Sequence, residues 1–428
     1  MKTTAVRMYG AMDVRMEAFE LPKIREDEIL VKVVSDSICM STYKTIVLGQ
    51  KHRRVMHDIS KHPVIIGHEF AGDIVKVGEK YQDRFQPGMR YAIQPALNYN
   101  GSIASPGYSY EYLGGACTYC ILAPEVMIQD CLLPFEGEGY YQASLAEPVG
   151  CIIGAFHASY HTKTGSYVHE MGTKAGGAMA LLGAAGPMGL GAIDYALHGG
   201  RPPRLLVVAD IDEERLERAR RLFPEEEASA QGTKLIFVNS SVEDTPSKEA
   251  DDPKCIAERL MLFNDGKGFD DVFVFAPVTS VIETGAQMLG RDGCLNFFAG
   301  PTDTQLSAWI NMYDVHYNGT HFVGTSGGNT EDMREALALC AEKKLNPAVM
   351  ITHVGGLDAC AEATKNLPQL PGGKKLIYTH IQMPLTAIAD FGKLGETDVR
   401  FARLAQICEA NNGLWSAEAE AYLLEAWS

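Results

Sequence analysis

The chain has 428 residues, which is too long for one ordinary domain and favours two. Its composition, with 46% hydrophobic and 21% charged residues, is typical of a globular protein with a substantial core. The formal net charge of −16 argues against a nucleic-acid partner or an anionic membrane surface, because both favour lysine and arginine.

The N-terminus and the cysteines indicate a cytoplasmic protein. The first residues, MKTTAVRMYGAMDVRME, contain no apolar signal-peptide core, and no apolar stretch reaches the length of a membrane span. Ten cysteines are scattered through the chain, a pattern that fits reduced thiols better than a disulfide framework.

The predicted elements change in character near residue 150. Before it, Gly, Pro and Asn clusters separate short strands, which predicts a β-rich domain with strands at 29–35, 63–78, 89–94 and 116–124. After it, strands and helices alternate over 178–199, 204–223, 270–277 and 293–300. This alternation predicts an α/β domain with a doubly wound parallel sheet.

A glycine-rich turn joins the first strand of the second domain to its helix. It reads Gly183-Ala-Ala-Gly186-Pro187-Met188-Gly189, so the last two glycines of a GxGxxG fingerprint are present and alanine replaces the first. Such a turn lets the backbone approach a pyrophosphate at the helix N-terminus. The motif is weak alone, but its position between a strand and a helix predicts a nicotinamide cofactor.

The next strand ends in VVAD and places Asp210 about twenty residues beyond the turn. A carboxylate there accepts a hydrogen bond from a ribose 2′-hydroxyl and repels a 2′-phosphate, which predicts NAD(H) in preference to NADP(H). The alternative stays open, because Arg215 lies one helical turn further on and could accommodate that phosphate.

Three separated motifs could supply metal ligands: SICMSTYK (37–44), GHEFAG (67–72) and LAEPVGCIIGAFH (145–157). Taken singly, Cys39 could be a core thiol, His68 a hydrogen-bonded core histidine and Glu147 an N-cap residue. Burying His68 and Glu69 in an apolar run costs several kcal/mol unless a partner is present. Together the motifs supply sulfur, imidazole and carboxylate, a set that suits zinc with one position open.

These motifs, in this order before the glycine turn, resemble the zinc-dependent medium-chain alcohol and polyol dehydrogenases over about residues 1–380. The resemblance implies a GroES-like catalytic domain over 1–150 and a Rossmann domain over 151–323. It also implies a return to the catalytic domain over 324–380. The remaining residues, 381–428, lie beyond the resemblance and are predicted to form a helical C-terminal extension. The extension reads as two helices with Asp398 and Ser416 as N-caps, an element for packing or oligomer contacts.

The resemblance also implies site residues. Cys39, His68 and Glu147 match the catalytic zinc ligands, while in the polyol branch Glu69 is a direct ligand and Glu147 holds the zinc-bound water, so both carboxylates are candidates. Ser41 matches the proton-relay hydroxyl. The outer end of that relay, often a histidine, is Lys44 here.

One departure concerns a lobe of four cysteines that binds a second, structural zinc in many members. The matching stretch, 96–115, contains no cysteine, so we expect a single catalytic zinc per chain. Cys117 and Cys120 are spaced CxxC, but they lie in a strand-like run without a second CxxC, which disfavours a metal or redox role.

Two further stretches, IQDCLLPFEGEGYYQASLAEPVG and MYDVHYNGTHFVGTSGGNTEDMR, resemble the L-sorbose-1-phosphate reductase branch. This implies a small-molecule substrate, L-sorbose 1-phosphate, that is reduced to D-glucitol 6-phosphate, and a homo-oligomer, either a dimer or a tetramer. The alternatives are a polyol dehydrogenase for an unphosphorylated sugar alcohol or another polyol phosphate, and a non-catalytic NAD(H)-binding protein.

A basic cluster fits a phosphorylated substrate. The loop 45–62 contains Lys51, His52, Arg53 and Arg54 in a row, and guanidinium groups suit bidentate capture of a phosphate. We therefore expect Arg53 and Arg54 to bind the substrate phosphate, the alternative being a solvated loop.

Overall fold

The computed structural model describes residues 1–163, 165–241 and 253–427, which fall into two units. Unit 1 combines Met1–Pro148 with Asn329–Ser428, and unit 2 is Val149–Gly328. Unit 1 is therefore discontinuous: the chain leaves it near residue 148 and returns near residue 329.

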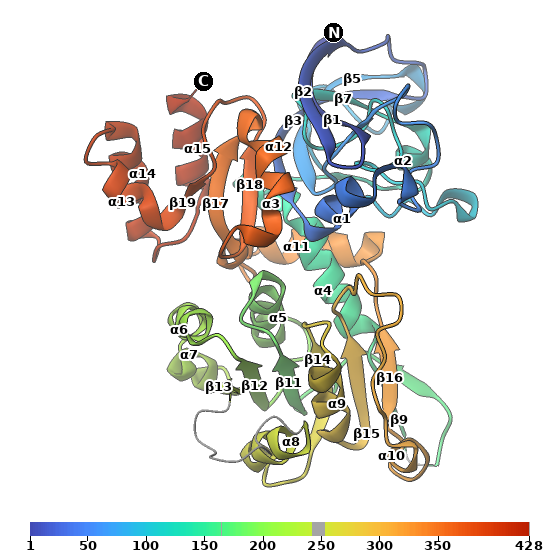
Figure 1. The fold of residues 1–428 in the computed structure, drawn as a ribbon, viewed down its shortest axis with the longest axis vertical. Helices are drawn as coiled ribbons and strands as arrows, with labels where there is room; N and C mark the ends of the chain where they lie inside the picture. The colour runs from blue at the N-terminus through green and yellow to red at the C-terminus, as the bar shows by residue number, and fades with distance from the viewer. Residues whose placement is uncertain (164, 242–252, 428) are drawn as a thin grey trace. The chain divides into compact units, whose positions relative to one another are not determined.

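Two antiparallel-rich sheets form the framework of unit 1 (Figure 1). One has the order β2-β1-β4, and the other has the order β19-β17-β18-β3-β5-β6-β8 with β7 also paired to β3. The strands are β1 (Lys2–Gly10), β2 (Asp13–Glu20), β3 (Ile29–Ile38), β4 (Val64–Ile65), β5 (Phe70–Val77), β6 (Arg90–Ile93), β7 (Tyr119–Leu122), β8 (Leu132–Pro134), β17 (Ile351–Gly356), β18 (Lys374–Tyr378) and β19 (Thr386–Ala387). The helices are α1 (Met40–Leu48), α2 (Pro124–Ile128), α3 (Tyr140–Ser144), α11 (Thr330–Ala341), α12 (Leu357–Lys365), α13 (Phe391–Leu394), α14 (Val399–Ala410) and α15 (Ala417–Ala426). Helix α4 (Ala146–Ala158) begins in unit 1 and continues into unit 2.

Strand β3 lies at the centre of the larger sheet. Nine of its ten residues are buried, and it pairs antiparallel with β5, β7 and β18. The pairing with β18 sets Lys375 opposite Ile38, so the returning segment lies directly beside the end of β3. The ligand motif that follows β3 is therefore held against the last third of the chain.

The strand expected over residues 63–78 is not continuous, which corrects the sequence analysis. Val64–Ile65 pairs with β1, whereas Phe70–Val77 pairs with β3 and β6. The break is at Gly67, whose φ of +90° is unfavourable for other residues and whose Cβ would lie 2.2 Å from an Asp36 carboxylate oxygen. His68 and Glu69 consequently lie in a turn between two sheets.

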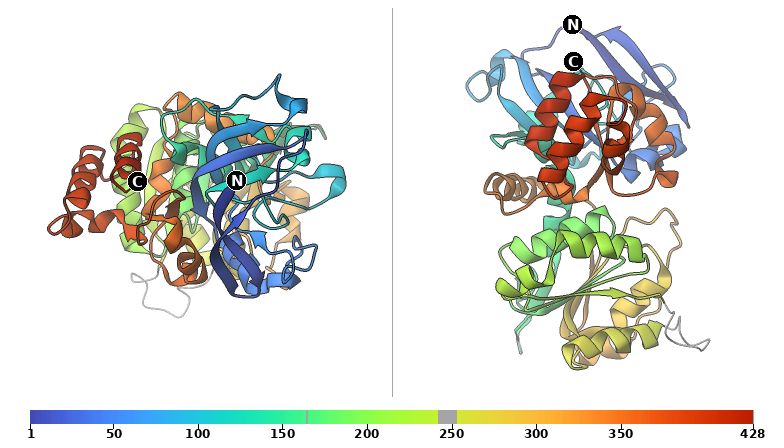
Figure 2. Two further views of the ribbon diagram at one scale, coloured as in Figure 1. Left: turned by 90° about the horizontal axis from the view of Figure 1, so that it is seen from above. Right: turned by 90° about the vertical axis from the view of Figure 1, so that its left-hand side faces the viewer.

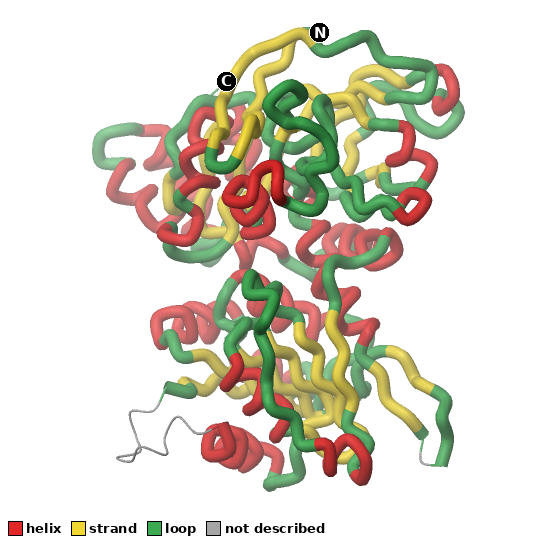
Figure 3. Tube along the Cα trace, turned by 45° about the vertical axis from the view of Figure 1, so that its right-hand side comes forward, coloured by secondary structure: helices red, strands yellow, loops and turns green. Residues whose placement is uncertain are grey.

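Unit 2 is built on the parallel sheet that the sequence predicts. Its six strands have the order β13-β12-β11-β14-β15-β16, with every pair parallel, the order of a doubly wound nucleotide-binding fold. Figure 2 shows α5 and α6 on one face of this sheet and α8 and α9 on the other, and Figure 3 shows its strands side by side.

The elements of unit 2 have the following bounds. The strands are β9 (Tyr160–Thr162), β10 (His169–Met171), β11 (Ala178–Leu182), β12 (Leu205–Asp210), β13 (Lys234–Asn239), β14 (Phe269–Val274), β15 (Leu289–Phe297) and β16 (His321–Gly324). The helices are α5 (Pro187–His198), α6 (Glu213–Leu222), α7 (Glu225–Ala230), α8 (Pro253–Met261), α9 (Thr279–Gln287) and α10 (Met312–Tyr317).

The C-terminal extension packs on unit 1 through α14 and α15. The two expected N-caps are confirmed, because the Asp398 and Ser416 side chains accept hydrogen bonds from backbone amides in the first turns of their helices. Trp415, fully buried between these helices, packs near Phe391 and Tyr378. The extension is thus an integral part of the core of unit 1.

All ten cysteines are thiols rather than parts of disulfide bonds. In the part of the chain that the structure describes, no helix is both long and apolar enough to cross a membrane.

Candidate active site and metal centre

Three predicted metal ligands meet in unit 1. Cys39 ends the turn from β3 into α1, where it is the N-cap residue, and His68 and Glu69 come from the turn between β4 and β5. One sulfur, one imidazole nitrogen and one carboxylate oxygen of these residues lie within 4.8 Å of one another. Among the described residues this is the one group of three or more histidine, cysteine and acidic side chains that could hold a metal ion.

The His68 ring is oriented by hydroxyl groups on both of its nitrogens. Thr42 Oγ1 lies 3.3 Å from Nδ1, while Ser41 Oγ and the Tyr108 hydroxyl lie 3.2 Å and 3.4 Å from Nε2. A proton on Nδ1, donated to Thr42, leaves the Nε2 lone pair free as a metal ligand. Burial lowers the pKa of His68 to about 4, which keeps the ring neutral as ligation requires.

Glu69 forms a buried ion pair with Lys374, the first residue of β18. The ammonium nitrogen is 2.6 Å from each carboxylate oxygen. Burial acts against both charges, but Lys374 holds the pKa of Glu69 below its usual value, and Glu69, Cys39 and Glu147 raise the pKa of Lys374. Both groups are therefore ionised, and each carboxylate oxygen keeps a lone pair for a second cation.

The donor set fits zinc. Burial, followed by the charge of Glu69, raises the pKa of the Cys39 thiol to about 12, so the thiolate forms here only if a cation offsets those effects. Ser41 Oγ donates a hydrogen bond to Cys39 Sγ at 3.0 Å. Sulfur, nitrogen and oxygen donors with one position left over are the arrangement of a catalytic rather than a structural zinc.

Two other residues predicted for this site, Glu147 and Lys44, lie outside the group formed by Cys39, His68 and Glu69. Glu147 lies in the first turn of α4 and is absent from the three-residue group, although its charge acts on Cys39 and Lys374. Lys44 lies in α1, one turn beyond Ser41. The structure therefore groups Glu69 with Cys39 and His68, and leaves Glu147 nearby as an additional carboxylate.

The segment 96–115, which lacks the expected cysteines, contributes a residue to the site instead. Gly107 packs so tightly against the turn that its Cβ would lie 2.3 Å from the Gly67 carbonyl oxygen. The next residue, Tyr108, is buried with its ring centroid 5.0 Å from that of His68. This lobe therefore packs directly against the metal ligands.

The basic loop connects to the same tyrosine. The Arg54 guanidinium lies over the Tyr108 ring, 5.0 Å from its centroid, and the His52 ring stacks on Tyr108 at 5.6 Å. Burial, followed by Arg54 and Arg53, lowers the pKa of His52. Arg54 is half-buried and Arg53 is exposed, so the structure distinguishes two arginines that the sequence treats alike. Part of the expected loop 45–62 is also helical, since α1 continues to Leu48.

All six predicted cofactor residues line one cavity of about 1070 Å³ in unit 2. The six are Gly183, Gly186, Pro187, Met188, Gly189 and Asp210. Gly186 is the N-cap of α5 and Pro187 its first residue, so the positive end of this helix faces the cavity. The cavity has the lining and position of a dinucleotide site.

Asp210 is fixed at the end of β12 by three backbone amides. One carboxylate oxygen accepts from the Ala185 amide at 2.9 Å, and the other accepts from the Ile211 and Asp212 amides at 2.8 Å and 3.1 Å. Arg215, the alternative residue for a 2′-phosphate, forms an ion pair with Asp212 at 3.1 Å.

Comparison with known proteins identifies the family. An alcohol dehydrogenase GroES-like domain matches residues 25–134, and a zinc-binding dehydrogenase domain matches residues 187–342. The mannitol-1-phosphate 5-dehydrogenase of Aliivibrio fischeri is 51% identical over 99% of this chain and 98% of its own length. The chain belongs to the zinc-binding dehydrogenases. The L-sorbose 1-phosphate reductase of Klebsiella pneumoniae is 47% identical over 99% of this chain and 97% of its own length.

A solved structure confirms the fold of this zinc-binding dehydrogenase. A zinc-binding dehydrogenase from Sinorhizobium meliloti bound to NADP superposes with a TM-score of 0.69 at 19% identity, covering 88% of this chain and 99% of that one. The family and its fold establish this protein as an NAD(P)-dependent alcohol or polyol dehydrogenase that uses zinc.

Three residues of the dehydrogenase site were not predicted from the sequence. Thr42 lies inside a recognised motif and could have been assigned by its spacing from Cys39. One feature of the sequence could have indicated Lys374: two lysines begin the otherwise apolar strand KKLIY. A lysine buried in such a strand needs a partner of opposite charge. No feature of the sequence indicated Tyr108, because the neighbouring residues, Tyr-Ser-Tyr over 108–110, do not show which tyrosine is buried.

The two glycines of the turn give a matched prediction. A Cβ at Gly189 would lie 2.0 Å from the Ala184 carbonyl oxygen, whereas at Gly186 it would meet no atom within 4 Å. Gly189→Ala should therefore lower the free energy of unfolding by about 1–3 kcal/mol, as overpacking does. Gly186→Ala should keep the wild-type stability but raise the NADH dissociation constant about tenfold, because its methyl group intrudes where the backbone approaches the pyrophosphate.

Thermal unfolding and NADH fluorescence titration of both variants measure these effects. Equal loss of stability in the two variants, or undiminished NADH binding by Gly186→Ala, would contradict this interpretation of the turn.

Proposed function

We propose that this zinc-binding dehydrogenase reduces a ketose phosphate with NADH, converting L-sorbose 1-phosphate to D-glucitol 6-phosphate. The observation that carries the proposal is the arrangement around Tyr108, which contacts the metal histidine with its hydroxyl and supports the Arg54 guanidinium on its ring. A cation beside a zinc site is what a phosphorylated carbonyl substrate requires. The names of the two relatives, both for sugar-phosphate enzymes, support the same substrate class.

The residues of unit 1 have separate roles in this reaction. Cys39, His68 and Glu69 hold one zinc per chain, and Glu147 is the additional carboxylate for the metal or its water. When bound, zinc supplies a Lewis acid to the substrate oxygen and the nicotinamide supplies the hydride.

The proton for the new hydroxyl group comes through Ser41. Its Oγ already makes hydrogen bonds beside both Cys39 and His68, so it is placed among the ligands. Lys44, one turn further along α1 and partly exposed, connects this hydroxyl to solvent. General acid catalysis of this kind needs a group within hydrogen-bond reach of the substrate oxygen.

The cofactor preference that we propose is NAD(H) over NADP(H). The carboxylate of Asp210 is held at the rim of the cavity by backbone amides and cannot easily turn away from a 2′-phosphate. Arg215, which lines the same cavity, is partly neutralised by its ion pair with Asp212. Its charge is therefore less available to bind a 2′-phosphate.

We expect kcat/KM to be at least about tenfold higher with NADH than with NADPH, which corresponds to about 1.4 kcal/mol. Asp210→Ser should narrow this ratio, because it removes the repulsion and retains a hydroxyl for hydrogen bonding. Steady-state kinetics with both cofactors measure the ratio, and a preference of the wild type for NADPH would contradict the role of Asp210.

The substrate phosphate tests the proposed function directly. Arg54→Ala should raise KM for L-sorbose 1-phosphate about tenfold or more, since a charged hydrogen bond is lost, and should leave activity on free L-sorbose unchanged. Arg53→Ala is the matched variant and should change KM less than about threefold, because Arg53 is exposed.

NADH oxidation by the wild type and both variants, with phosphorylated and free ketoses, provides the measurement. Equal efficiency of the wild type on free and phosphorylated ketoses would favour an unphosphorylated polyol as substrate. Equal losses by Arg54→Ala on both substrates would mean that the loop shapes the site without binding the phosphate.

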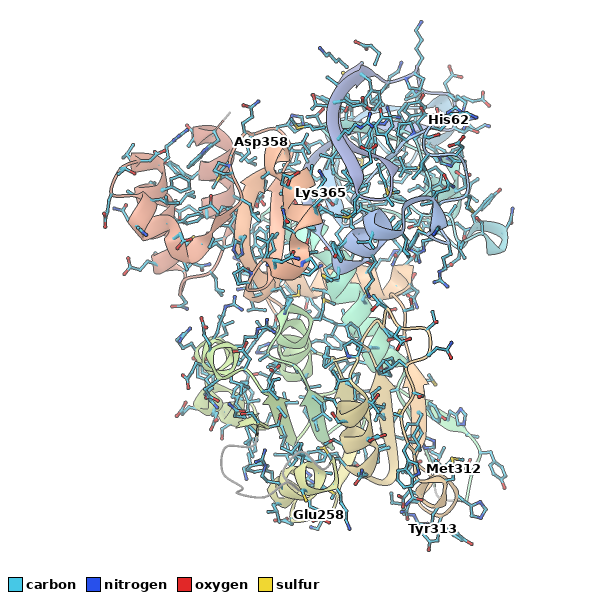
Figure 4. All side chains as sticks on the ribbon, in the orientation of Figure 1. His62, Glu258, Met312, Tyr313, Asp358 and Lys365 are labelled. Carbon is cyan, nitrogen blue, oxygen red and sulfur yellow. The ribbon has the colours of Figure 1, made fainter. Side chains whose placement is uncertain are left out.

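We also propose that the enzyme is a homo-oligomer. Large apolar side chains, each more than 60% exposed, gather on and before α10: Trp309, Met312, Tyr313 and Tyr317. Figure 4 labels Met312 and Tyr313 on this helix, in the same unit as the edge strand β16. An exposed apolar patch beside a sheet edge is suited to a second copy of the chain. Analytical ultracentrifugation tests this, and a mass of 46.7 kDa, that of one chain, would contradict it.

A further inference from the structure

The C-terminal extension, residues 381–428, contains a buried carboxylate that the proposed reaction does not use. Glu420 lies on the buried face of α15 and is 3% exposed. Its Oε1 accepts a hydrogen bond from the Tyr140 amide at 2.5 Å, and its Oε2 accepts from the Tyr141 amide and the Tyr378 hydroxyl, each at 2.8 Å. Trp415 in turn donates to the Tyr378 oxygen at 2.7 Å. A buried carboxylate is tolerated only with such donors.

The two amides that Glu420 binds open helix α3. The N-cap position of α3 is Gly139, which has no side chain to accept hydrogen bonds from the first turn. Glu420, nearly 280 residues away in the sequence, supplies the missing cap, and its negative charge also suits the positive end of the helix. Burial raises the pKa of Glu420, while its three donors act in the opposite direction and favour the carboxylate.

Helix α3 leads directly to a predicted residue of the metal site. It ends at Ser144, whose hydroxyl accepts a hydrogen bond of 2.6 Å from Ser35 in β3, and α4 begins two residues later at Ala146. Glu147 therefore follows α3 by three residues. Because so short a connection allows little independent movement, the position of α3 determines the position of Glu147.

We propose that Glu420 is a positioning residue for the metal site: by capping α3, it fixes the segment that presents Glu147 to Cys39, His68 and Glu69. This inference rests on the role given to Glu147 in the proposed function. The C-terminal extension then helps to position a residue of the metal site, in addition to its contribution to the core of unit 1.

A double-mutant cycle on the full-length protein tests this inference through zinc affinity, measured by competition with a chromogenic chelator. Glu420→Gln should raise the zinc dissociation constant about tenfold, a usual effect of losing a residue that supports a metal site. In the Glu147→Gln background, the same substitution should change the constant less than about twofold, because the carboxylate that it positions is gone.

The matched control is Glu418→Gln, on the same helix but exposed and paired with Arg403, which should leave zinc affinity unchanged. An unchanged zinc affinity in Glu420→Gln, or the same factor with and without Glu147, would overturn the inference and leave Glu420 a purely structural role.

If Glu420→Gln does not fold, Tyr378→Phe serves in its place in the same double-mutant cycle. It removes one hydrogen-bond donor to Glu420 and keeps the two backbone amides of α3 that also donate to it. Its expected effect is about threefold, again lost in the Glu147→Gln background. Because zinc affinity is measured without substrate, failure of the sugar-phosphate assignment would leave this result unaffected.

Discussion

The buried ion pair between Lys374 and Glu69 is the interaction on which the metal site depends. The two residues are 305 positions apart, their charged groups are 2.6 Å from each other, and their side chains are 6% and 1% exposed. Removing one partner of such a pair costs about 3–5 kcal/mol in other proteins, because the remaining charge is buried and unpaired. The site is therefore complete only when the returning segment has paired β18 with β3.

The same pair explains how a carboxylate can remain ionised in a buried turn and still act as a ligand. Lys374 stabilises the charge of Glu69 but occupies only part of the acceptor capacity of its two oxygens. A zinc ion held by this group would favour the Cys39 thiolate, which burial otherwise disfavours. With zinc bound, one lysine and one metal ion would balance the Glu69 and Glu147 carboxylates and the Cys39 thiolate, while His68 stays neutral.

Local patterns in the sequence predicted much of this arrangement. The alternation of strands and helices predicted the parallel sheet, and the glycine turn depends on neighbouring residues alone. The assignment of Cys39, His68 and Glu69 as ligands came instead from the order of the motifs and from the family resemblance. The residues that were missed act across long separations: Lys374, Tyr108 and Glu420 reach partners between 40 and 305 residues away. The local patterns of one sequence do not show which distant segments come into contact. The break at Gly67 was recognisable in principle, since glycine inside a strand pattern often marks a bend.

The central claim is that one zinc is held by Cys39, His68 and Glu69, and that the lobe 96–115 replaces a structural zinc with direct packing through Gly107 and Tyr108. X-ray absorption at the zinc edge of the isolated enzyme, combined with its metal content, tests this most directly. The account predicts one zinc per chain with one sulfur and otherwise nitrogen and oxygen neighbours. A second tightly held zinc, or an average of two or more sulfur neighbours per zinc, would contradict it.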